Sequence, residues 1–368
     1  MRPKTLSSDS HVMEPPDLWS AAVPPRFADL APHVEMDQDA DWWVQEGRRL
    51  FSFSVATKAG LRFEGQDRLS VDYRFSDVRP GSYLPEAHVA DNETDGVSGS
   101  VLYPSVATIL FGLEDTEALS VLGRIYNDWI AEFCQAAPDR LKGIGIVNVD
   151  DITDAVRELE RMRGCGLAGA MIPVAPLPEL PYDSPEYEAL WTAAERLELP
   201  LSLHIASNRS PDDWRQLWTQ AGFVGSDHYV RDSIGRMIFS GVFERHPGLM
   251  VGSVEHEAAW APYFLERMDY TYTERTPRPG WYRFTDDARP SDFFHTNVFI
   301  SFQEDRVGVQ LRDVIGVDNL LWGSDYPHAE STFPRSQAIL DDIMSGVPSD
   351  ERAQMTSANT ARLYGFAL

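Results

Sequence analysis

The chain has 368 residues, with 57 acidic and 32 basic side chains and a formal net charge of −25. That charge repels phosphate backbones and argues against nucleic-acid binding. Hydrophobic residues make up 43% of the chain, which is enough for one large α/β domain or two ordinary ones. The sequence has two cysteines, and it shows no charged-then-apolar leader and no apolar run of about 18 residues. We therefore expect a cytoplasmic protein that does not enter a membrane.

The first predicted strand spans residues 6–10, and a long segment without clear periodicity follows it. Residues 15–95 are rich in proline, aspartate and aromatic side chains. A loop of this length usually carries function, so we expect residues 12–96 to form a lid-like insertion or a wall of a substrate pocket. The alternative is an insertion that only packs on the surface.

From residue 97 onward, apolar strands alternate with amphipathic helices. Strands are predicted at 97–103, 141–149, 167–174, 201–205, 249–254, 297–302 and 320–323. Helices are predicted at 115–136, 152–163, 185–197, 227–243, 258–273 and 306–315, and within 335–363. Residues 275–295 are predicted to be irregular. Eight strand–helix units predict an α/β fold of the (β/α)8 TIM-barrel type, in one domain over residues 1–368, with a doubly wound sheet as the alternative.

Metal-binding residue types stand at the end of the first strand. Asp9 and His11 are two apart, so their side chains share one face of a strand, and Glu14 follows in the turn. Together they could bind one metal ion. The alternative is an aspartate that caps the turn, beside an ordinary histidine.

Three further strand ends carry the same residue types. They provide His204, then Glu255 and His256, and finally Asp325 and His328. In a barrel these ends converge on one mouth, whereas in an open sheet they would be spread along an edge. The pattern therefore favours the barrel and predicts a metal site at its mouth.

The predicted metal ligands outnumber the positions of one zinc ion. The full set is Asp9, His11, Glu14, His204, Glu255, His256, Asp325 and His328, and Gln303 and Glu304 lie close to another strand end. Carboxylate and imidazole ligands without thiolate suit iron or manganese as well as zinc. The set predicts two metal ions, unless some of these groups only hydrogen-bond to the ligands.

These motifs resemble the amidohydrolase superfamily, in the branch that includes aminocarboxymuconate-semialdehyde and γ-resorcylate decarboxylases. Segments typical of this branch are residues 126–129, 241–247 and 359–365. The resemblance implies that Asp9, His11, His204 and Asp325 are metal ligands and that His256 acts in catalysis. It also implies that the lysine bridge of many two-metal hydrolases is absent, because residues 167–173 contain no lysine.

Within the superfamily, the chain resembles barrel-type non-haem diiron monooxygenases, whose known example acts in platensimycin and platencin biosynthesis, a secondary metabolism. The similar segments are residues 9–14, 255–260, 301–305 and 323–330. This resemblance implies an oxidoreductase with two iron ions that hydroxylates an unactivated carbon of a bulky terpenoid or other acyl substrate with O2. It implies a CoA-linked substrate, an external electron donor, and His256, Asp325 and Gln303 as catalytic residues.

Two alternatives to the monooxygenase remain. A decarboxylase or hydrolase would use one zinc or manganese ion, bound by Asp9, His11, His204 and Asp325, while His256 moves the proton. The second alternative is a barrel that has lost catalytic activity and serves as a binding scaffold. This alternative is disfavoured because every matched ligand position still carries a residue that can bind a metal ion. Barrels of this family often form homodimers, although no interface is evident in the sequence.

Three arginines lie close together in this acidic chain. Arg275, Arg278 and Arg283 flank Trp281 and Tyr282 and could bind the phosphate or carboxylate of an acyl-CoA. The alternative is a solvated loop with scattered arginines.

Overall fold

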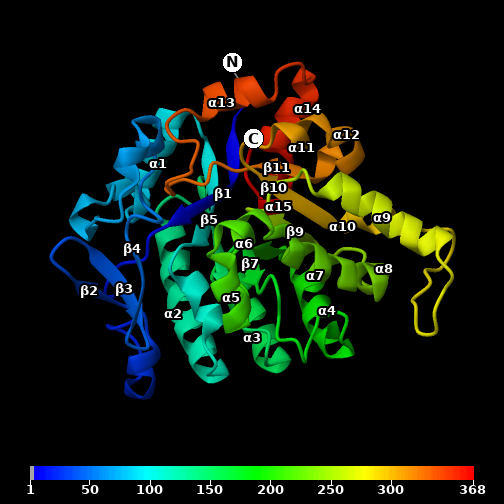
Figure 1. Cartoon of the computed structure of the whole chain (residues 1–368), viewed down its shortest axis with the longest axis horizontal. Coiled ribbons are helices and arrows are strands. Elements are labelled where there is room, and N and C mark those ends of the chain that lie inside the picture. Colours follow the sequence, from blue (N-terminus) through cyan, green and yellow to red (C-terminus); the bar gives the residue numbers. More distant parts are fainter. Residues whose placement is uncertain (1–3) are drawn as a thin grey trace.

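The computed structural model describes residues 4–368, so the first three residues of the predicted domain lie outside the described residues. Eight parallel strands follow one another around a barrel (Figure 1): β1 (Leu6–Val12), β5 (Gly99–Pro104), β6 (Leu141–Ile146), β7 (Gly169–Ile172), β8 (Leu201–His204), β9 (Val251–Val254), β10 (Val298–Phe302) and β11 (Leu320–Trp322). Backbone hydrogen bonds from His11 N to Tyr326 O (2.6 Å) and from Asp325 N to Asp9 O (2.9 Å) join the first strand to the segment after the last. The predicted TIM barrel is confirmed.

Helices cover the outside of the barrel. They include α2 (Thr116–Gln135), α3 (Ile152–Gly164), α4 (Glu188–Leu197), α7 (Asp227–Phe239), α9 (Ala261–Glu274) and α13 (Ser336–Ile343). Asp115 and Asp151 cap α2 and α3, since each carboxylate accepts a backbone N–H three residues on. In β6, Gly145 faces these two helices, and a Cβ there would lie 2.5 Å from the methyl of Met162. The apolar core therefore lies between the strands and a closely packed helical layer.

The shorter elements complete the barrel and its connections. The short helices are α5 (Pro211–Leu217), α6 (Gln220–Val224), α8 (Val242–Arg245), α10 (Pro290–Asn297), α11 (Arg306–Gln310), α12 (Arg312–Ile315), α14 (Ser349–Ala353) and α15 (Asn359–Tyr364), with a π-helical turn at Gln354–Ala358. Single 3-10 turns occur at Pro25–Leu30, Leu61–Phe63, Gln66–Leu69, Phe75–Asp77, Pro80–Ser82, Ala107–Gly112, Pro185–Tyr187 and Val317–Asn319.

The insertion between β1 and β5 has regular structure that the sequence analysis missed. It contains an antiparallel sheet of β2 (His33–Met36), β3 (Asp41–Gln45) and β4 (Arg48–Ser52), and the helix α1 (Pro85–Asp95). The turn between β3 and β4 places Glu46 and Gly47 at φ 52° and 68°. Trp43 contacts Trp19 and Phe53, with ring centroids 6.0 and 5.5 Å apart, and these aromatic side chains join the insertion to the core of the barrel.

Other predictions about secondary structure were wrong in part, among them the single helix over 306–315, which is divided into α11 (Arg306–Gln310) and α12 (Arg312–Ile315). The segment 275–295, predicted to be irregular, contains most of α10, which begins at Pro290. The single helix predicted over 227–243 ends at Phe239, and Gly241, at φ 74°, separates it from α8. Within residues 4–368, no helix is long and apolar enough to cross a membrane.

Candidate metal centre

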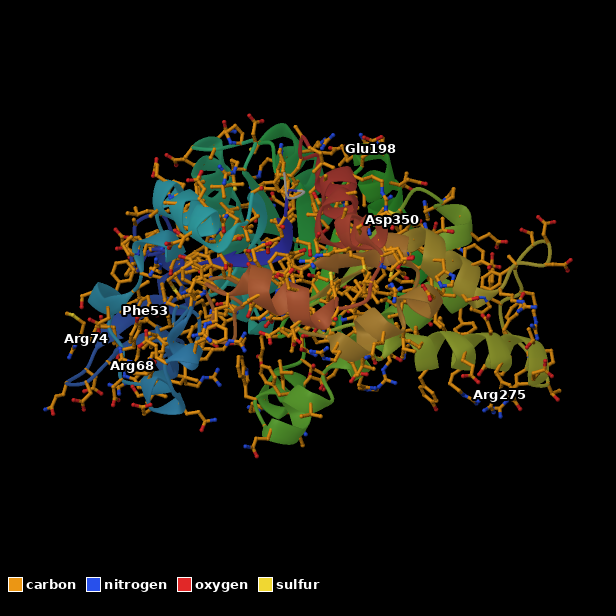
Figure 2. The ribbon with its side chains drawn as sticks, turned by 90° about the horizontal axis from the view of Figure 1, so that it is seen from above. Phe53, Arg68, Arg74, Glu198, Arg275 and Asp350 are labelled. Carbon is orange, nitrogen blue, oxygen red and sulfur yellow. The ribbon has the colours of Figure 1, made fainter. Side chains whose placement is uncertain are left out.

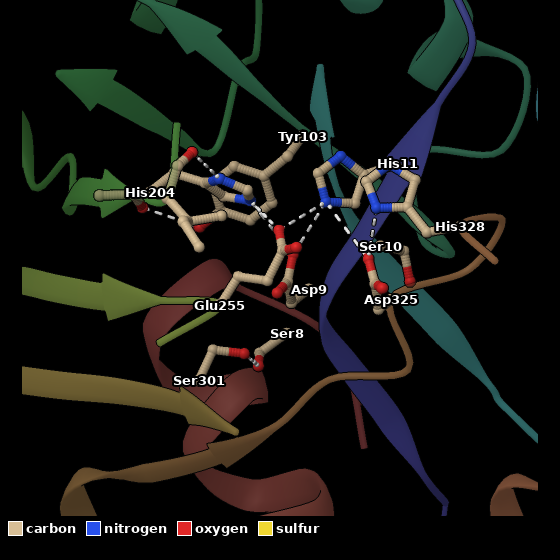
Figure 3. Close-up of polar contacts among 12 residues, drawn as sticks. Ser8, Asp9, Ser10, His11, Tyr103, His204, Glu255, Ser301, Asp325 and His328 are labelled. Atoms are coloured by element: carbon tan, nitrogen blue, oxygen red, sulfur yellow. Dashed lines mark hydrogen bonds and ion pairs between the residues drawn. The ribbon is translucent and has the colours of Figure 1, made fainter. Parts of the chain in front are cut away.

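The metal-binding residue types meet at the carboxyl ends of four strands (Figure 3). Asp9 and His11 belong to β1, and His204 is the last residue of β8. Glu255 follows β9, and Asp325 follows β11. The register of β1 against β5 shifts between Ser7 and Ser10, so β1 carries one extra residue just before the site. Such a bulge re-aims the side chains around it, here Asp9 and His11.

Two overlapping groups of side chains could hold a metal ion. One group is Asp9, His11, His204 and Glu255, and the other is His11, Glu255, Asp325 and His328. Within each group, the potential ligand atoms lie within 4.8 Å of one another. His11 and Glu255 belong to both groups, so the six residues form one continuous cluster, which we call the mouth cluster.

His11 lies at the centre of the mouth cluster. Its Nε2 is 3.5 Å from Asp9 Oδ1, from Glu255 Oε2 and from Asp325 Oδ1. His204 Nε2 lies 3.1 Å from Glu255 Oε2 (Figure 3). The ring of His328 stacks on that of His11 at 3.9 Å, and its Nδ1 is 2.9 Å from Asp325 Oδ1.

Hydrogen bonds on the far side of the histidines orient their free nitrogens. His11 Nδ1 is 3.0 Å from the carbonyl of Pro104, and His204 Nδ1 is 2.9 Å from that of Ile205. A carbonyl oxygen only accepts, so each Nδ1 donates, and in the neutral ring each Nε2 presents a lone pair to the cluster. This arrangement is typical of histidines that bind metal ions.

The atoms that face one another in the mouth cluster lack hydrogen-bond partners. Among the described residues, these buried atoms include Asp9 Oδ1, His11 Nε2, His204 Nε2, Glu255 Oε2 and both carboxylate oxygens of Asp325. Lone pairs opposed at 3.1 to 3.5 Å repel each other unless a cation or a proton lies between them. The donor set, all oxygen and imidazole nitrogen, fits a divalent metal ion.

Burial and like charge perturb the acids and bases of the cluster. Burial and the nearby Asp325 carboxylate raise the pKa of Glu255 well above its usual range. Burial, with Glu330 and Asp9, does the same to the pKa of Asp325. Burial also lowers the pKa of His11, whereas for His204 the carboxylates of Asp9 and Glu255 outweigh burial and raise the pKa.

Backbone strain is concentrated at the strand ends that carry the cluster. Glu255 and Asp325 have φ 62° and 58°, and Ala206 and Glu257 next to the site have φ 64° and 54°. Non-glycine residues rarely adopt this left-handed region, and such strain is found more often at functional sites.

Two cavities adjoin the mouth cluster. The first, the acidic cavity, has a volume of about 510 Å³, and its lining includes Asp9, Glu255, His256, Glu257, Gln303 and Glu330. The second, the apolar cavity, has a volume of about 80 Å³, and its lining includes His11, Phe51, Val55, Ala56, Ile109 and His328. Three of these residues, Phe51, Val55 and Ala56, come from the insertion.

Glu14 does not join the mouth cluster. Its Oε2 and Oε1 accept the backbone N–H groups of Val106 and Ala107, both at 2.9 Å, and the side chain is fully buried. The prediction that Glu14 is a metal ligand is therefore not supported. Its carboxylate instead ties the turn after β1 to the turn after β5.

His256 and Gln303 lie beside the cluster and outside the two ligand groups. His256 Nδ1 is 3.4 Å from Ser253 Oγ, and its Nε2 is buried without a hydrogen-bond partner. Burial lowers the pKa of His256 to about 3. Gln303 Nε2 donates to the carbonyl of Glu330 at 2.7 Å. Both side chains line the acidic cavity.

The three arginines proposed for substrate binding are not brought into the site. Arg275 follows the outer end of α9, far to one side of the molecule (Figure 2). Arg283 donates to the carbonyl of Tyr272 at 2.7 Å. Together with Arg278, they line neither cavity beside the cluster. The three arginines are close in sequence, but they lie away from the mouth cluster because α9 leads the chain outward from the barrel.

The sequence analysis missed Glu257 and Tyr103. Glu257 directly follows Glu255 and His256 in the sequence. Only this position beside two predicted site residues could have indicated that Glu257 belongs to the site. Tyr103, near the end of β5, packs its ring 5.0 Å from His204, and its hydroxyl hydrogen-bonds Ser202 Oγ at 2.7 Å. Tyr103 lies in an apolar strand, and the sequence of such a strand does not show whether a tyrosine points toward the barrel axis.

The chain is similar to known proteins in both sequence and fold. A family model described as Amidohydrolase matches residues 104–366. A γ-resorcylate decarboxylase of Rhizobium radiobacter is 27% identical over 273 residues, which cover 68% of this chain and 78% of that protein. An amidohydrolase of Mycobacterium avium subsp. paratuberculosis superposes with a TM-score of 0.81 at 21% identity and covers 100% of this chain and 99% of that chain. A dihydroxybenzoic acid decarboxylase of a Polaromonas species, with bound manganese, superposes with a TM-score of 0.66 at 19% identity and covers 99% and 97%.

These relatives overturn the prediction of a diiron monooxygenase. The curated relatives that the chain matches include further γ-resorcylate decarboxylases and a 2-amino-3-carboxymuconate-6-semialdehyde decarboxylase of Dictyostelium discoideum. Decarboxylation needs no O2, external electron donor or pair of iron ions. The oxidoreductase, diiron, electron-donor and CoA-thioester predictions therefore lose their support, and the decarboxylase alternative is favoured.

Proposed function

Because the chain belongs to the amidohydrolase family, we propose that it is a metal-dependent decarboxylase that removes CO2 from a small aromatic or unsaturated acid. The observation that carries the proposal is the mouth cluster, with its buried and unpartnered nitrogen and oxygen atoms. The similarity to γ-resorcylate decarboxylase supports this reaction over oxygen activation.

In this proposal, one manganese or zinc ion is bound by Asp9, His11 and His204, which form one ligand group with Glu255. Asp325 joins them through its contact with His11, whose Nε2 lies 3.5 Å from Asp325 Oδ1. When bound, such an ion supplies a positive charge that neutralises the substrate carboxylate. The absence of cysteine from the ligand set is compatible with either metal.

The chain itself supplies the proton that replaces the carboxylate. His328 is outside the proposed ligand set, and its Nδ1 lies 2.9 Å from Asp325 Oδ1. We assign proton delivery to His328. The sequence predicts that His256 moves the proton, and its Nε2 is buried beside the cluster without a hydrogen-bond partner, so this role stays a prediction.

We also propose that the insertion, residues 12–96, works as a wall of the substrate pocket. Phe51, Val55 and Ala56 line the apolar cavity on the side of the cluster where His11 and His328 stack, and a bound substrate would complete the apolar wall there. A dry wall strengthens the electrostatic interactions at the reacting carboxylate.

The test begins with elemental analysis of protein purified without chelators from medium supplemented with manganese, zinc and iron. We expect about one manganese or zinc ion per chain. CO2 release is then measured with 2,6-dihydroxybenzoate and 5-carboxyvanillate, on metal-loaded and chelator-treated protein. We expect release only from the metal-loaded form, without O2 consumption. Two irons per chain with substrate-dependent O2 consumption would contradict the proposal.

A further inference from the structure

Tyr103 crosses the interior of the barrel next to the mouth cluster. It belongs to β5, where it is the register partner of His11 on β1. Its hydroxyl reaches Ser202 on β8, although β6 and β7 lie between these two strands in the sheet. The side chain is fully buried, and its ring lies beside His204 and His11 (Figure 3). Tyr103 therefore shapes the metal centre although it belongs to neither ligand group.

Three rings contact one another at this point. The ring centroid of Tyr103 lies 5.0 Å from that of His204 and 6.1 Å from that of His11, and the two imidazoles are 5.1 Å apart, edge to face. His204 hydrogen-bonds through Nδ1 to the carbonyl of Ile205, and its Nε2 has no hydrogen-bond partner. The outer torsion of a histidine is broad, so one hydrogen bond leaves the ring free to tilt. Packing against Tyr103 restricts that tilt.

The hydroxyl of Tyr103 is held at the other end of its ring. It hydrogen-bonds Ser202 Oγ at 2.7 Å and the hydroxyl of Tyr364 at 3.3 Å. Ser202 lies two residues before His204 on β8, so both side chains face the barrel interior. Tyr103 therefore spans two positions of one strand, with its hydroxyl on Ser202 and its ring against His204.

Tyr364 brings the C-terminal helix α15 into the same network. It lies in the segment 359–365, one of those typical of this branch of the amidohydrolase superfamily, and it is 4% exposed. Its ring centroid is 6.2 Å from that of Phe299, and it lines a cavity at the amino ends of the strands, on the face opposite the mouth. A continuous series of contacts thus runs from α15 through Tyr103 to His204.

The hydroxyl groups in this network are buried and depend on one another. Each hydroxyl has one hydrogen to donate and can accept as well, and Tyr103 joins the other two. Removal of its oxygen leaves Ser202 and Tyr364 short of a partner inside the barrel. Hydrogen bonds have a direction, whereas apolar packing has none, so this network fixes where the Tyr103 ring lies.

We propose that Tyr103 and Tyr364 are positioning residues for the metal centre. Their hydrogen-bonded hydroxyls hold the Tyr103 ring against His204, and this contact sets the direction in which His204 presents Nε2 to the ion. The inference rests on the metal dependence of the proposed function and adds two residues that neither ligand group contains. It also assigns the segment 359–365 a part in metal binding, from the far side of the barrel.

Two measurements on Tyr103→Phe, which removes one oxygen and keeps the ring, test the proposal. Competition between the manganese-loaded protein and a chelator measures Mn²⁺ affinity, and the visible absorption of cobalt-loaded protein reports the ligand geometry. We expect Tyr103→Phe to bind Mn²⁺ at least about tenfold more weakly than wild type, with shifted Co²⁺ bands, as when the support of a metal-binding histidine is removed. A loss of affinity below about threefold, or an unchanged Co²⁺ spectrum, would overturn the inference.

Tyr182→Phe is the matched control. The hydroxyl of Tyr182 donates to the carbonyl of Pro173 at 2.6 Å, its side chain is fully buried, and its ring packs on Tyr187 and Trp191. This variant loses a buried hydrogen bond, as Tyr103→Phe does, and should leave Mn²⁺ affinity and the Co²⁺ bands unchanged. An equal loss of Mn²⁺ affinity in both variants would indicate general destabilisation and overturn the inference.

Tyr364→Phe tests the network without changing the residue that contacts His204, so it decides the question even if Tyr103→Phe does not fold. We expect it to weaken Mn²⁺ binding at least about threefold. The double variant with Tyr103→Phe should bind Mn²⁺ no more weakly than Tyr103→Phe alone, because both changes remove the same hydrogen bond. Wild-type Mn²⁺ affinity in Tyr364→Phe would overturn the inference.

The experiment separates this inference from the proposed function. Wild-type protein that retains neither Mn²⁺ nor Zn²⁺ would contradict the metal-dependent function, and the inference would fail with it. Wild-type protein that binds Mn²⁺ and releases CO2, beside a Tyr103→Phe variant of equal Mn²⁺ affinity, would overturn the inference and leave the function standing.

Discussion

Replacing Glu14 by glutamine distinguishes its structural role from the metal-binding role that its sequence position indicates. Glu14 accepts two backbone N–H groups, from Val106 and Ala107, at 2.9 Å each. A glutamine presents one oxygen and one NH2 group, so one of these buried amides faces a donor. A buried donor without a partner costs about 1 to 3 kcal/mol. We expect Glu14→Gln to lower the free energy of unfolding by this amount at about pH 5.

The cost should change with pH in a defined direction. Burial raises the pKa of Glu14 from 4.5 to about 7. The folded state therefore holds the proton more tightly, and this contribution to stability is complete below pH 4.5 and is lost as the pH rises through about 7. The shift corresponds to about 3 kcal/mol. Glutamine does not titrate, so the difference in unfolding free energy between wild type and variant should shrink by up to about 3 kcal/mol between pH 5 and pH 8.

Urea unfolding followed by circular dichroism at the two pH values measures this difference, and other titrating groups cancel because both proteins contain them. Elemental analysis of the loaded proteins provides the second readout, and the metal content of Glu14→Gln should equal that of wild type. Glu255→Gln is the matched control, since it makes the same chemical change inside the mouth cluster and should lower metal content. A Glu14→Gln protein that loses metal and shows the same stability difference at both pH values would refute the reasoning.

Three further predictions address the cluster and its support. His204→Ala removes an inward-facing Nε2 and should reduce bound metal and CO2 release to background, as measured by elemental analysis and isotope release; normal metal content would exclude His204 as a ligand. Burial raises the pKa of Glu255 and Asp325, so protons compete with the metal ion at these carboxylates. Saturating manganese should therefore increase Tm by more at about pH 8 than at about pH 6. A manganese-induced increase in Tm that is the same at both pH values would contradict this competition. Asp305 accepts the N–H groups of Ala258, Ala259 and Gly308, each at 2.7 Å, so Asp305→Ala should lower the free energy of unfolding by about 2 to 4 kcal/mol in urea, and a loss below about 0.5 kcal/mol would contradict that role.

Glu14 also shows where sequence spacing stops being informative. The spacing of Asp9 and His11 predicts that they face one site, and they do, although the bulge between Ser7 and Ser10 also sets the direction of Asp9. Three residues on, Glu14 lies in a turn, where side-chain direction depends on what the turn packs against. The amides of Val106 and Ala107, more than ninety residues away, capture its carboxylate.

The insertion and the arginines show the same limit. The strands β2, β3 and β4 have four or five residues each, too few for a clear alternating pattern, and Glu46 is an unusual residue for a left-handed turn position. The arginines at 275–283 are close in sequence, but the direction of α9 decides that they lie away from the mouth (Figure 2).

The sequence by itself determined the barrel and most of the metal cluster. Strands alternating with helices must form a parallel sheet, and the carboxyl ends of parallel strands meet on one side, so His204, Glu255 and Asp325 could be assigned to one site without coordinates. The sequence motifs did not determine the reaction, because oxygenases and decarboxylases use the same types of metal ligand. Similarity to known decarboxylases favours decarboxylation. Only the tertiary structure decided which acids face the cluster and which face a backbone amide. It alone also showed the two cavities beside the cluster, because direction and distance across strands are set by packing between segments that are far apart in the chain.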